Sequence, residues 1–181
     1  MAAGNAERFG ENKLLRDIGG RPLFSYGLDV MRALVSERGD CSLTVVTQYA
    51  EIAGYCVGHG VRCVINPDSR FGASYTIRAG IRAVMPEKGD FLVFAAADQP
   101  YIRKETVQKL LDAASTDAEA ARVFYGEIPG NPVLFSASLV PELNALTGDD
   151  GGRSILKKHE CIRVQADSRD ELKDIDRPDD I

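Results

Sequence analysis

One aspartate in the sequence stands where an open β-sheet could bind a metal ion. The apolar run FLVFAAA, residues 91–97, ends directly in Asp98. Ligands of open parallel sheets bind beyond the carboxyl ends of the strands, and a carboxylate there needs water or a cation because a buried strand offers no partner. Since Mg²⁺ is commonly held by one or two carboxylates and substrate phosphates, Asp98 is the first metal-ligand candidate. An Asx turn or helix cap beside Pro100 is the structural alternative.

A second candidate site lies in the opening segment AAGNAERFGENKLL, residues 2–15. Gly4 and Gly10 allow backbone N–H groups to approach phosphate oxygens, and Arg8 and Lys13 can add charge-assisted contacts to a polyphosphate. The spacing matches neither the G-x-x-x-x-G-K-[ST] nor the G-x-G-x-x-G phosphate motif. The segment predicts a phosphate-binding loop, with a glycine-rich turn carrying solvated charges as the alternative.

Two further segments could bring polar groups to the same edge. GDDGGRSIL, residues 148–156, opens a helix, so its N–H groups and Arg153 could receive an anion, although a plain helix start explains it equally well. The acidic tail, residues 167–180, could supply a second metal ligand from Asp174 or Asp176, whereas most such charge runs are solvated.

The other reactive residues predict no further centre. His59 and His159 have no partner at ligand spacing, and Ser74 has no visible base. The cysteines form no C-x-x-C pair and are interpreted as small hydrophobes, so neither zinc nor disulfides are expected.

Short apolar runs alternate with segments of helical period along the whole chain. The runs predict β-strands at residues 42–47, 61–65, 91–97, 122–125, 132–135 and 161–164. Helices are predicted at residues 22–35, at 74–85 and after Tyr101, from apolar residues that recur on one face. The alternation predicts a single α/β domain over residues 1–181, with a largely parallel sheet between helix layers.

Composition and charge narrow the class of protein. Hydrophobic residues make up 44% of the 181-residue chain and charged residues 27%, which is ordinary for a globular domain. The longest apolar run is far shorter than the roughly 20 residues that span a bilayer, and no export signal is visible, so we expect a cytoplasmic protein. A net charge of −5 gives no general attraction to nucleic acid or to anionic membranes.

The first predicted strand is unusually short. Two or three residues precede Gly4, whereas a central strand usually runs about five residues. Either this strand is a stub or the natural start lies upstream, and we expect the effect to fall on stability more than on chemistry.

The motifs resemble those of the MobA-like nucleotidyltransferases, and more closely those of the molybdenum cofactor cytidylyltransferase branch. MAAGNAERFGENK, residues 1–13, is similar to the opening signature L-A-A-G-x-S-x-R-M-G-x-x-K. Residues 66–80 resemble N-P-x-x-x-x-G-x-x-x-S-x-x-x-G, and Asp98 and Pro100 fit the D-x-P element. Three further family motifs are matched in family order: G-x-P-V-L-F at residues 130–135, G-D-x-G-x-R at residues 148–153 and D-I-D-T-P-E-D at residues 174–180.

The resemblance implies a role for each matching position. The implied nucleotide-binding residues are Ala2, Ala3, Gly4, Arg8, Lys13, Asn66, Thr76 and Gly80. Catalysis would rest on Arg8, Lys13 and Asp98, with Mg²⁺ held by Asp98 and Asp176. The implied acceptor-binding residues are Asn131, Asp149, Arg153 and Asp174.

The resemblance also implies a fold and an activity. The fold would be the three-layer α/β/α Rossmann-like nucleotidyltransferase fold, and the reaction would be Mg²⁺-dependent transfer of CMP from CTP to the phosphate of molybdopterin, releasing pyrophosphate. Ala3 favours the pyrimidine because the guanylyltransferases carry A-G-G in place of A-A-G. A molybdenum hydroxylase would be the protein partner. Guanylyl transfer, another small acceptor such as a sugar phosphate, and a non-catalytic maturation factor for that hydroxylase remain alternatives.

The chain departs from the family pattern at several positions. Ala6 replaces a common Ser and so removes a hydroxyl near the phosphates, Phe9 replaces Met, and Thr76 keeps the hydroxyl of the usual Ser. Asn131 stands where many relatives have His, and Arg177 replaces Thr. Because these last two positions lie on the acceptor side, the resemblance specifies the acceptor least well.

Overall fold

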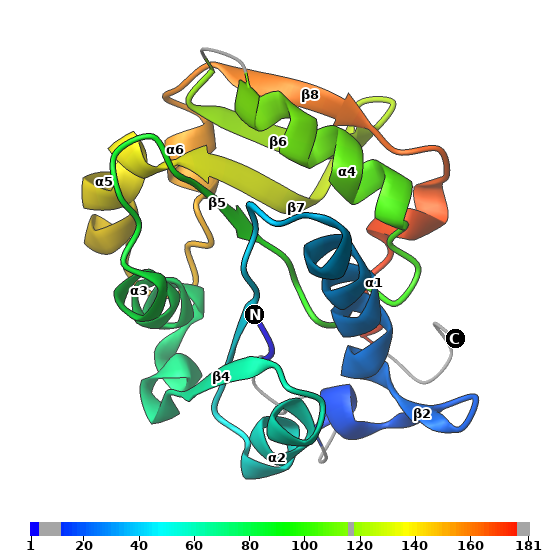
Figure 1. Ribbon diagram of the computed structural model, residues 1–181. Coiled ribbons are helices and arrows are strands. Elements are labelled where there is room, and N and C mark those ends of the chain that lie inside the picture. The colour runs from blue at the N-terminus through cyan, green and yellow to red at the C-terminus, as the bar shows by residue number, and fades with distance from the viewer. Residues whose placement is uncertain (4–11, 116–117, 177–181) are drawn as a thin grey trace.

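Helices and strands alternate along the chain, and the strands occupy the centre of the molecule (Figure 1). The computed structural model describes residues 1–3, 12–115 and 118–176. Within these ranges, no helix has both the length and the apolar character needed to cross a membrane.

The strands form both parallel and antiparallel ladders. β3 (Thr44–Thr47) pairs in parallel with β4 (Arg62–Ile65). A four-stranded sheet has the order β5–β7–β6–β8, with β5 at Phe91–Phe94, β6 at Ala120–Tyr125, β7 at Ile128–Ser136 and β8 at Cys161–Gln165. β7 is antiparallel to β6 because it returns from β6 through a tight hairpin turn; it is also antiparallel to β5, whereas β6 and β8 are parallel.

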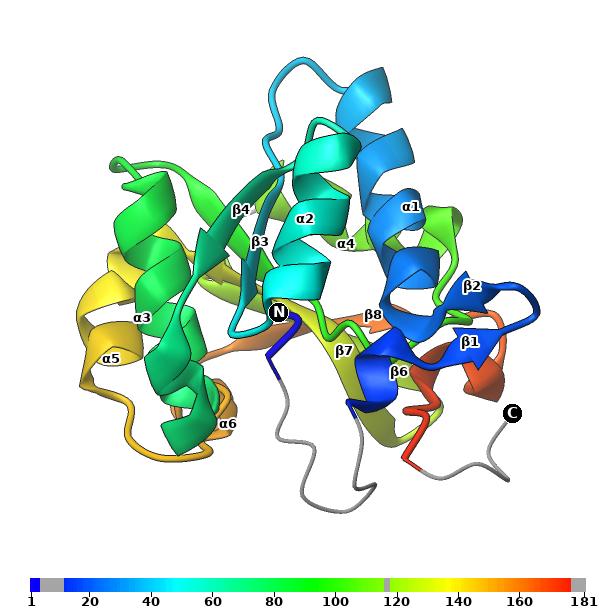
Figure 2. The same ribbon diagram turned by 90° about the horizontal axis from the view of Figure 1, so that it is seen from below.

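Helices cover both faces of the strands (Figures 1 and 2). One layer holds α1 (Leu23–Glu37), α2 (Ala50–Gly58) and α4 (Lys104–Asp112). The other holds α3 (Ala73–Val84), α5 (Val140–Ala145) and α6 (Arg153–Leu156). The alternation of side chains along β3 reflects the two layers, since Val45 packs in the core with Leu28 of α1 while Val46 lies against Gly80 of α3.

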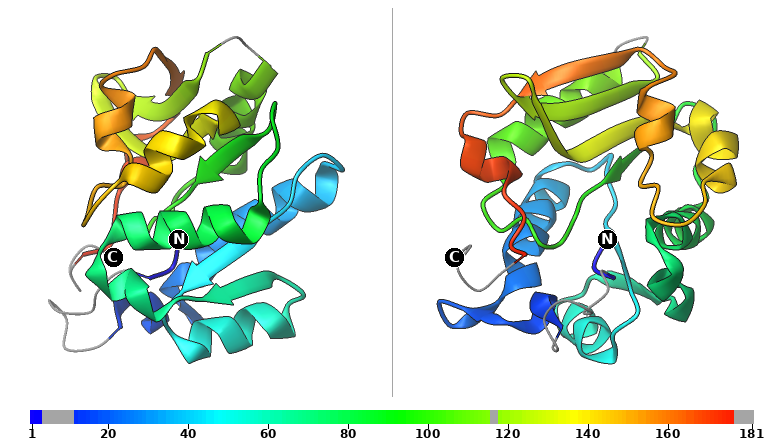
Figure 3. Two further views of the ribbon diagram at one scale, coloured as in Figure 1. Left: turned by 90° about the vertical axis from the view of Figure 1, so that its left-hand side faces the viewer. Right: turned by 180° about the vertical axis from the view of Figure 1, so that it is seen from behind.

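Two apolar clusters fix the helices on the four-stranded sheet. Ile77 of α3 packs with Phe135 of β7 on one face, and Leu110 of α4 packs with Val123 of β6 on the other. Each fully buried side chain of this kind stabilises the fold by about 1.5–3 kcal/mol relative to an exposed one. Helix α3 thereby lies beside both the four-stranded sheet and β4, as Figure 3 shows.

The predicted α/β/α architecture is confirmed, and each predicted strand and helix has a counterpart, the short first strand only as an isolated bridge of Ala2 with Thr47. The sheet is mixed, because β7 enters antiparallel between β5 and β6. The strand expected at residues 91–97 ends at Phe94, which pairs with Val133. The next partner along β7 would be Pro132, which has no N–H to donate, so the ladder stops there.

The structure also contains elements that the sequence pattern did not predict: α2, α5 and the short hairpin of β1 (Asp17–Ile18) and β2 (Arg21–Pro22). The turn of that hairpin is made by Gly19 and Gly20, both at positive φ, +61° and +85°. Two consecutive glycines adopt this backbone without steric cost.

Candidate active site

Asp98 lies just beyond the carboxyl end of β5, and the C-terminal segment runs beside it. The backbone N–H of Ile175 donates to the Asp98 carbonyl oxygen at 3.0 Å, and the Ile175 side chain is buried in the core of α1, α2 and β3. This anchor brings Asp174 and Asp176, which flank Ile175 in sequence, to the same place as Asp98.

Lys13 reaches this carboxylate cluster from the opposite end of the chain. It begins η1, the 3₁₀ turn Lys13–Leu15, which is capped by Asn12 and fixed by the buried side chain of Leu14. The Lys13 Nζ donates to Asp98 Oδ2 at 2.7 Å and to Asp176 Oδ1 at 2.6 Å. The Lys13 and Asp98 side chains are 16% and 22% exposed, so this ion pair is shielded from bulk water, whereas Asp176 is 58% exposed.

The charges of this cluster shift its titration. Burial alone would lower the pKa of the Lys13 ammonium, but the charge of Asp98 and the hydrogen bonds to both carboxylates outweigh burial and leave that pKa raised. The Asp174 side chain is exposed, yet neighbouring atoms displace part of its water. This partial desolvation, followed by the charge of nearby Asp98, raises the pKa of the Asp174 carboxyl. The cluster therefore carries more negative charge than Lys13 alone can neutralise.

Buried Glu171 holds the C-terminal segment in position. It lies in η5 (Arg169–Leu172), where its Oε1 accepts hydrogen bonds from the N–H groups of Asp167 and Ser168. Its Oε2 accepts from the N–H of Arg103, in the loop that follows Asp98. One carboxylate thus ties the tail to the loop that carries the candidate metal ligand.

A cavity of about 210 Å³ adjoins the charged cluster. It is lined by Met1, Ala3, Lys13, Leu14, Ser69, Gly72, Ala73, Thr76, Ala96, Ala97, Asp98 and Asp149. A larger cavity of about 530 Å³ lies between β3 and β5 and includes neither Lys13 nor Asp98. We place the candidate active site at the smaller cavity because the charged groups converge there.

Asp149 reaches the cavity because two loops approach very closely. Gly72, at φ +129°, precedes α3, and a Cβ built on it would lie 2.3 Å from the Gly148 carbonyl oxygen. The N–H of Ser74 donates to that same oxygen at 3.1 Å. Only glycine allows this contact, so Gly72 sets the spacing between α3 and the Gly148 loop.

The structure places the predicted nucleotide-binding residues in different surroundings. Ala3 and Thr76 line the cavity, and Ala2 is buried beside β3. Asn66 lies outside it, where its amide donates to the Ser69 hydroxyl and to the Tyr75 carbonyl oxygen. Gly80 lies outside it as well, packed on β3. Predicted Gly4 and Arg8 fall outside the described residues.

The structure also places the predicted acceptor-binding residues in different parts of the molecule. Asp149 borders the cavity, and Asp174 lies beside Asp98 at the edge of the site. Asn131 precedes a cis peptide bond to Pro132 in β7, and Arg153 is the exposed first residue of α6. Neither Asn131 nor Arg153 lines this cavity.

Two polar groups near the site were not predicted from the sequence to be binding residues. Asn12 Nδ2 and Ser74 Oγ are buried and have no hydrogen-bond partner among the residues that the structure describes. Asn12 immediately precedes Lys13, and Ser74 follows Ala73 of the cavity wall, so both could serve a bound ligand. The sequence indicated only that they lie next to predicted site motifs, because burial without a hydrogen-bond partner is a property of the tertiary structure.

His159, for which the sequence showed no partner at metal-ligand spacing, lies between two glutamates in the structure. His159 Nδ1 lies 2.7 Å from Glu119 Oε2, and Nε2 lies 2.8 Å from Glu142 Oε1. These two carboxylates raise the pKa of His159, Glu119 more than Glu142. The partners come from residues 40 and 17 positions away, so sequence spacing could not reveal them.

Oxygen ligands from two separate segments fit a hard divalent cation. Asp98 and Asp176 already converge on one positive charge, the Lys13 ammonium. In the described part of the chain, no group of three or more His, Cys, Asp or Glu residues is arranged to hold a metal ion. The donor set therefore suits Mg²⁺ or Mn²⁺ held jointly by protein carboxylates and ligand phosphates, not a closed protein site.

Residues 1–163 match the family model described as the MobA-like NTP transferase domain. The chain is 27% identical over 190 residues to the purine catabolism protein PucB of Bacillus subtilis, covering 99% of this chain and 90% of PucB. The crystal structure of Rv0371c from Mycobacterium tuberculosis has a TM-score of 0.80 at 24% identity, covering 99% of this chain and 91% of that one.

Two further solved structures share the fold. Rv0371c in complex with manganese has a TM-score of 0.76 at 22% identity, covering 98% of this chain and 91% of that one. The molybdopterin-guanine dinucleotide biosynthesis protein A of Archaeoglobus fulgidus has a TM-score of 0.71 at 16% identity, covering 99% and 91%. The fold is thus that of the α/β nucleotidyltransferases. By its family match, this chain belongs to the MobA-like NTP transferases.

Proposed function

We propose that this protein transfers a cytidylyl group from CTP to the terminal phosphate of a molybdopterin-type acceptor, with release of pyrophosphate. The observation that carries the proposal is the meeting of Lys13, Asp98 and Asp176 beside a cavity at the carboxyl ends of the strands, in a MobA-like NTP transferase. A metal-bound triphosphate needs both a cation and oxygen ligands at one place, and this cluster supplies both.

In the proposed reaction, an oxygen of the acceptor phosphate attacks the α-phosphorus of CTP. A new P–O bond forms there, the bond to the bridging oxygen of the β-phosphate breaks, and pyrophosphate leaves with that electron pair. A phosphate monoester has a second pKa near about 6, so the nucleophile is largely dianionic at neutral pH and needs no general base. Among the described residues that line the cavity there is no histidine, which is consistent with this mechanism.

The chain's own residues would neutralise and position charge. A divalent cation bound by Asp98 and Asp176 would offset the charge of the triphosphate. Lys13, which pairs with these carboxylates in the structure, would exchange them for phosphate oxygens when nucleotide and cation arrive together. Arg8, from the opening segment, would add a second positive contact.

Ala3 supports the choice of a pyrimidine. It is 6% exposed, lines the cavity, and its carbonyl oxygen accepts a hydrogen bond from Gln48 Nε2 at 2.9 Å. A methyl group in place of a glycine hydrogen narrows the space beside the base, which favours cytosine over the larger guanine. Ala3→Gly should therefore increase the use of GTP relative to CTP.

The test is pyrophosphate release from CTP, GTP and UTP, with and without molybdopterin and Mg²⁺. We expect release to require the pterin and the metal, to be fastest with CTP, and to be lost in Asp98→Asn. Asp112→Asn on α4, a surface carboxylate that is 63% exposed, is the matched control and should keep full activity. Turnover by Asp98→Asn would contradict the proposed metal-binding role of Asp98, whereas activity only with a sugar phosphate would contradict molybdopterin as the acceptor.

A further inference from the structure

Two arginines beside the candidate active site carry unpaired guanidinium groups. Arg122 lies half-buried on β6, and Arg153 is exposed at the start of α6. Arg122 Nε donates to the Gly130 carbonyl oxygen at 2.8 Å. Among the described residues, the terminal nitrogens of Arg122 and the whole Arg153 guanidinium have no hydrogen-bond or ion-pair partner. Arg163, opposite Arg122 on β8, is by contrast paired with Glu127 at 2.9 Å.

Helix α6 covers the face of the sheet from which Arg122 projects. Side chains alternate along a strand, so Arg122 shares this face with Ala120. Ala120 packs in one cluster with Ile155 of α6 and with Val133, the residue opposite Arg122 on β7. Burial, followed by the charge of Arg153, lowers the pKa of the Arg122 guanidinium. The fold therefore holds two positive charges close to each other.

The Arg122 side chain extends toward the edge of the sheet where Asp98 lies. β5, β6 and β8 run in the same direction, and Gly130 is nearer to their carboxyl ends than Val133 is. The contact with Gly130 brings the guanidinium to β7, the strand next to β5. Neighbouring strands are only about 4.8 Å apart, so the charge of Arg122 lies near the end of β5.

Packed contacts connect Gly130 with the charged cluster. A Cβ built on Gly130 would lie 2.3 Å from Leu172 Cγ, so the C-terminal segment rests directly on β7. The Leu172 carbonyl oxygen accepts a hydrogen bond from Gln99 Nε2 at 3.4 Å, and Gln99 directly follows Asp98. The backbone that holds Arg122 is thus two contacts away from the candidate metal ligand.

Arg153 is brought to the same edge by the loop that carries Asp149. Asp149 lines the smaller cavity, and the next residue, Asp150, accepts the Gly152 N–H at 2.9 Å. Hydrogen bonds from the Ser154 side chain and from backbone N–H groups of this loop lower the pKa of Asp150. Because this carboxylate is engaged with its own loop, the Arg153 guanidinium is available to a ligand.

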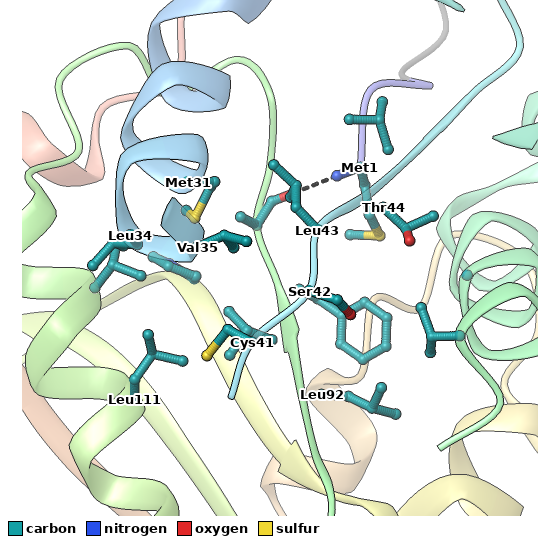
Figure 4. Close-up of a pocket in the computed structure, with 18 of the residues that line it drawn as sticks. Met1, Met31, Leu34, Val35, Cys41, Ser42, Leu43, Thr44, Leu92 and Leu111 are labelled. Carbon is teal, nitrogen blue, oxygen red and sulfur yellow. Dashed lines mark hydrogen bonds between the residues drawn. The ribbon is translucent and has the colours of Figure 1, made fainter. Parts of the chain in front are cut away.

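The larger cavity is less suited to a charged ligand. Figure 4 shows apolar side chains along it, among them Leu34, Leu92 and Leu111. Arg38, which also lines this cavity, is already paired with Asp40 at 2.9 Å. An anionic ligand is therefore expected at the pair of Arg122 and Arg153.

On the basis of the proposed function, we propose that Arg122 and Arg153 bind the phosphate of the acceptor, and that Arg122 selects for a phosphorylated acceptor. No sequence motif had singled out Arg122. Two guanidinium charges match the two charges of a phosphate monoester, and their planar N–H donors can pair with its oxygens. The bound phosphate relieves the repulsion between the arginines, and the arginines offset its repulsion by the triphosphate of CTP.

The first test measures the binding of inorganic phosphate by phosphorus NMR titration. Mg²⁺ and a non-hydrolysable CTP analogue are present, so that phosphate does not compete for Lys13. Arg122→Met keeps a long side chain on the sheet, and Arg153→Gln changes an exposed residue. Each should weaken phosphate binding at least about tenfold. Arg163→Gln, the matched control on the same face of the sheet, should change the affinity less than about twofold.

The second test separates the two substrates by the kinetics of pyrophosphate release. In Arg122→Met, the KM for the molybdopterin acceptor should rise at least about tenfold, because the acceptor loses a charge-assisted contact. The KM for CTP should stay within about twofold of the parent, because Lys13 is untouched. If Arg122 only held Gly130 in place, both KM values would change together.

Three results would overturn the proposal. They are unchanged phosphate binding in the arginine variants, an equal loss in Arg163→Gln, and an equal rise of both KM values. Arg153→Gln decides the binding test if Arg122→Met does not fold. If no nucleotide gives pyrophosphate with the pterin but both arginine variants lose phosphate binding, the proposed function fails while the arginine site stands.

Discussion

Replacing Lys13 by methionine should separate the electrostatic role of this side chain from its structural role. The substitution keeps a long unbranched stem but removes the ammonium that lies 2.7 Å from Asp98 Oδ2 and 2.6 Å from Asp176 Oδ1. It therefore leaves the carboxylates together without the cation that balances them.

The structure sets the expected size of the effect on stability. The contact with Asp98 is shielded, so its loss should cost about 1–2 kcal/mol of unfolding free energy, near the lower end of the range for a hydrogen bond to a charged group. The contact with Asp176 adds little because that side chain is 58% exposed and screened by water. For a chain of this size, the corresponding fall in Tm is about 2–8 °C.

The effect on activity should be larger than the effect on stability. Removing one preorganised charge from a site of this kind costs on the order of 3 kcal/mol in the transition state. That cost lowers kcat/KM by about 150-fold. The assay is pyrophosphate release at saturating Mg²⁺, together with calorimetric binding of CTP, where affinity should also fall.

A second lysine provides a matched control. Lys104 of α4 pairs with Glu37 at 2.7 Å on the surface, away from the cavity, and its side chain is 40% exposed. Lys104→Met should leave kcat/KM within about twofold of the parent, because exposed pairs contribute little. Unchanged turnover and CTP affinity in Lys13→Met, or an equal loss in Lys104→Met, would refute the assignment of Lys13 to the triphosphate.

Four further predictions concern stability. Glu171→Ala leaves three partly buried N–H groups without their acceptor and should lower the unfolding free energy by about 3 kcal/mol in urea titrations, whereas Glu171→Gln should lose less. Gly72→Ala should cost at least about 2 kcal/mol and weaken CTP binding, since its Cβ would collide with Gly148; a stable, active variant would contradict that contact. The raised pKa of His159 makes its stabilisation complete below about pH 6.5 and lost as pH rises through the raised value, so Tm should fall there in the parent but not in His159→Gln. The Met1 amine should give the opposite pH dependence, because burial lowers its pKa from 8.0 to about 6 in the folded chain. The unfolded chain then binds more protons between these two values, so the unfolding free energy should rise by about 2 kcal/mol from about pH 6 to pH 8, and acetylation of the amine should remove the rise.

The sequence by itself determined the elements and the types of residue at the site. Hydrophobic period distinguished the strands from α1, α3 and α4, because side chains repeat every second residue on a strand and every 3.6 residues on a helix. The apolar run before Asp98 placed that carboxylate beyond the carboxyl end of a strand, where the structure has it, although β5 is only partly buried. The motifs around Lys13 and Asp98 also carried the family resemblance, which the family match confirms.

The tertiary structure decided which of these residues meet. Lys13 and Asp176 are 163 positions apart, and they come together because Ile175 is buried in the core and bonded to the Asp98 backbone. The acidic tail looked like a solvated charge run, but Glu171 is buried, since its oxygens satisfy backbone N–H groups of two separate segments. The local sequence pattern indicates which helices and strands form. Which distant residues meet depends on how the layers pack, and that packing is set by all the residues together.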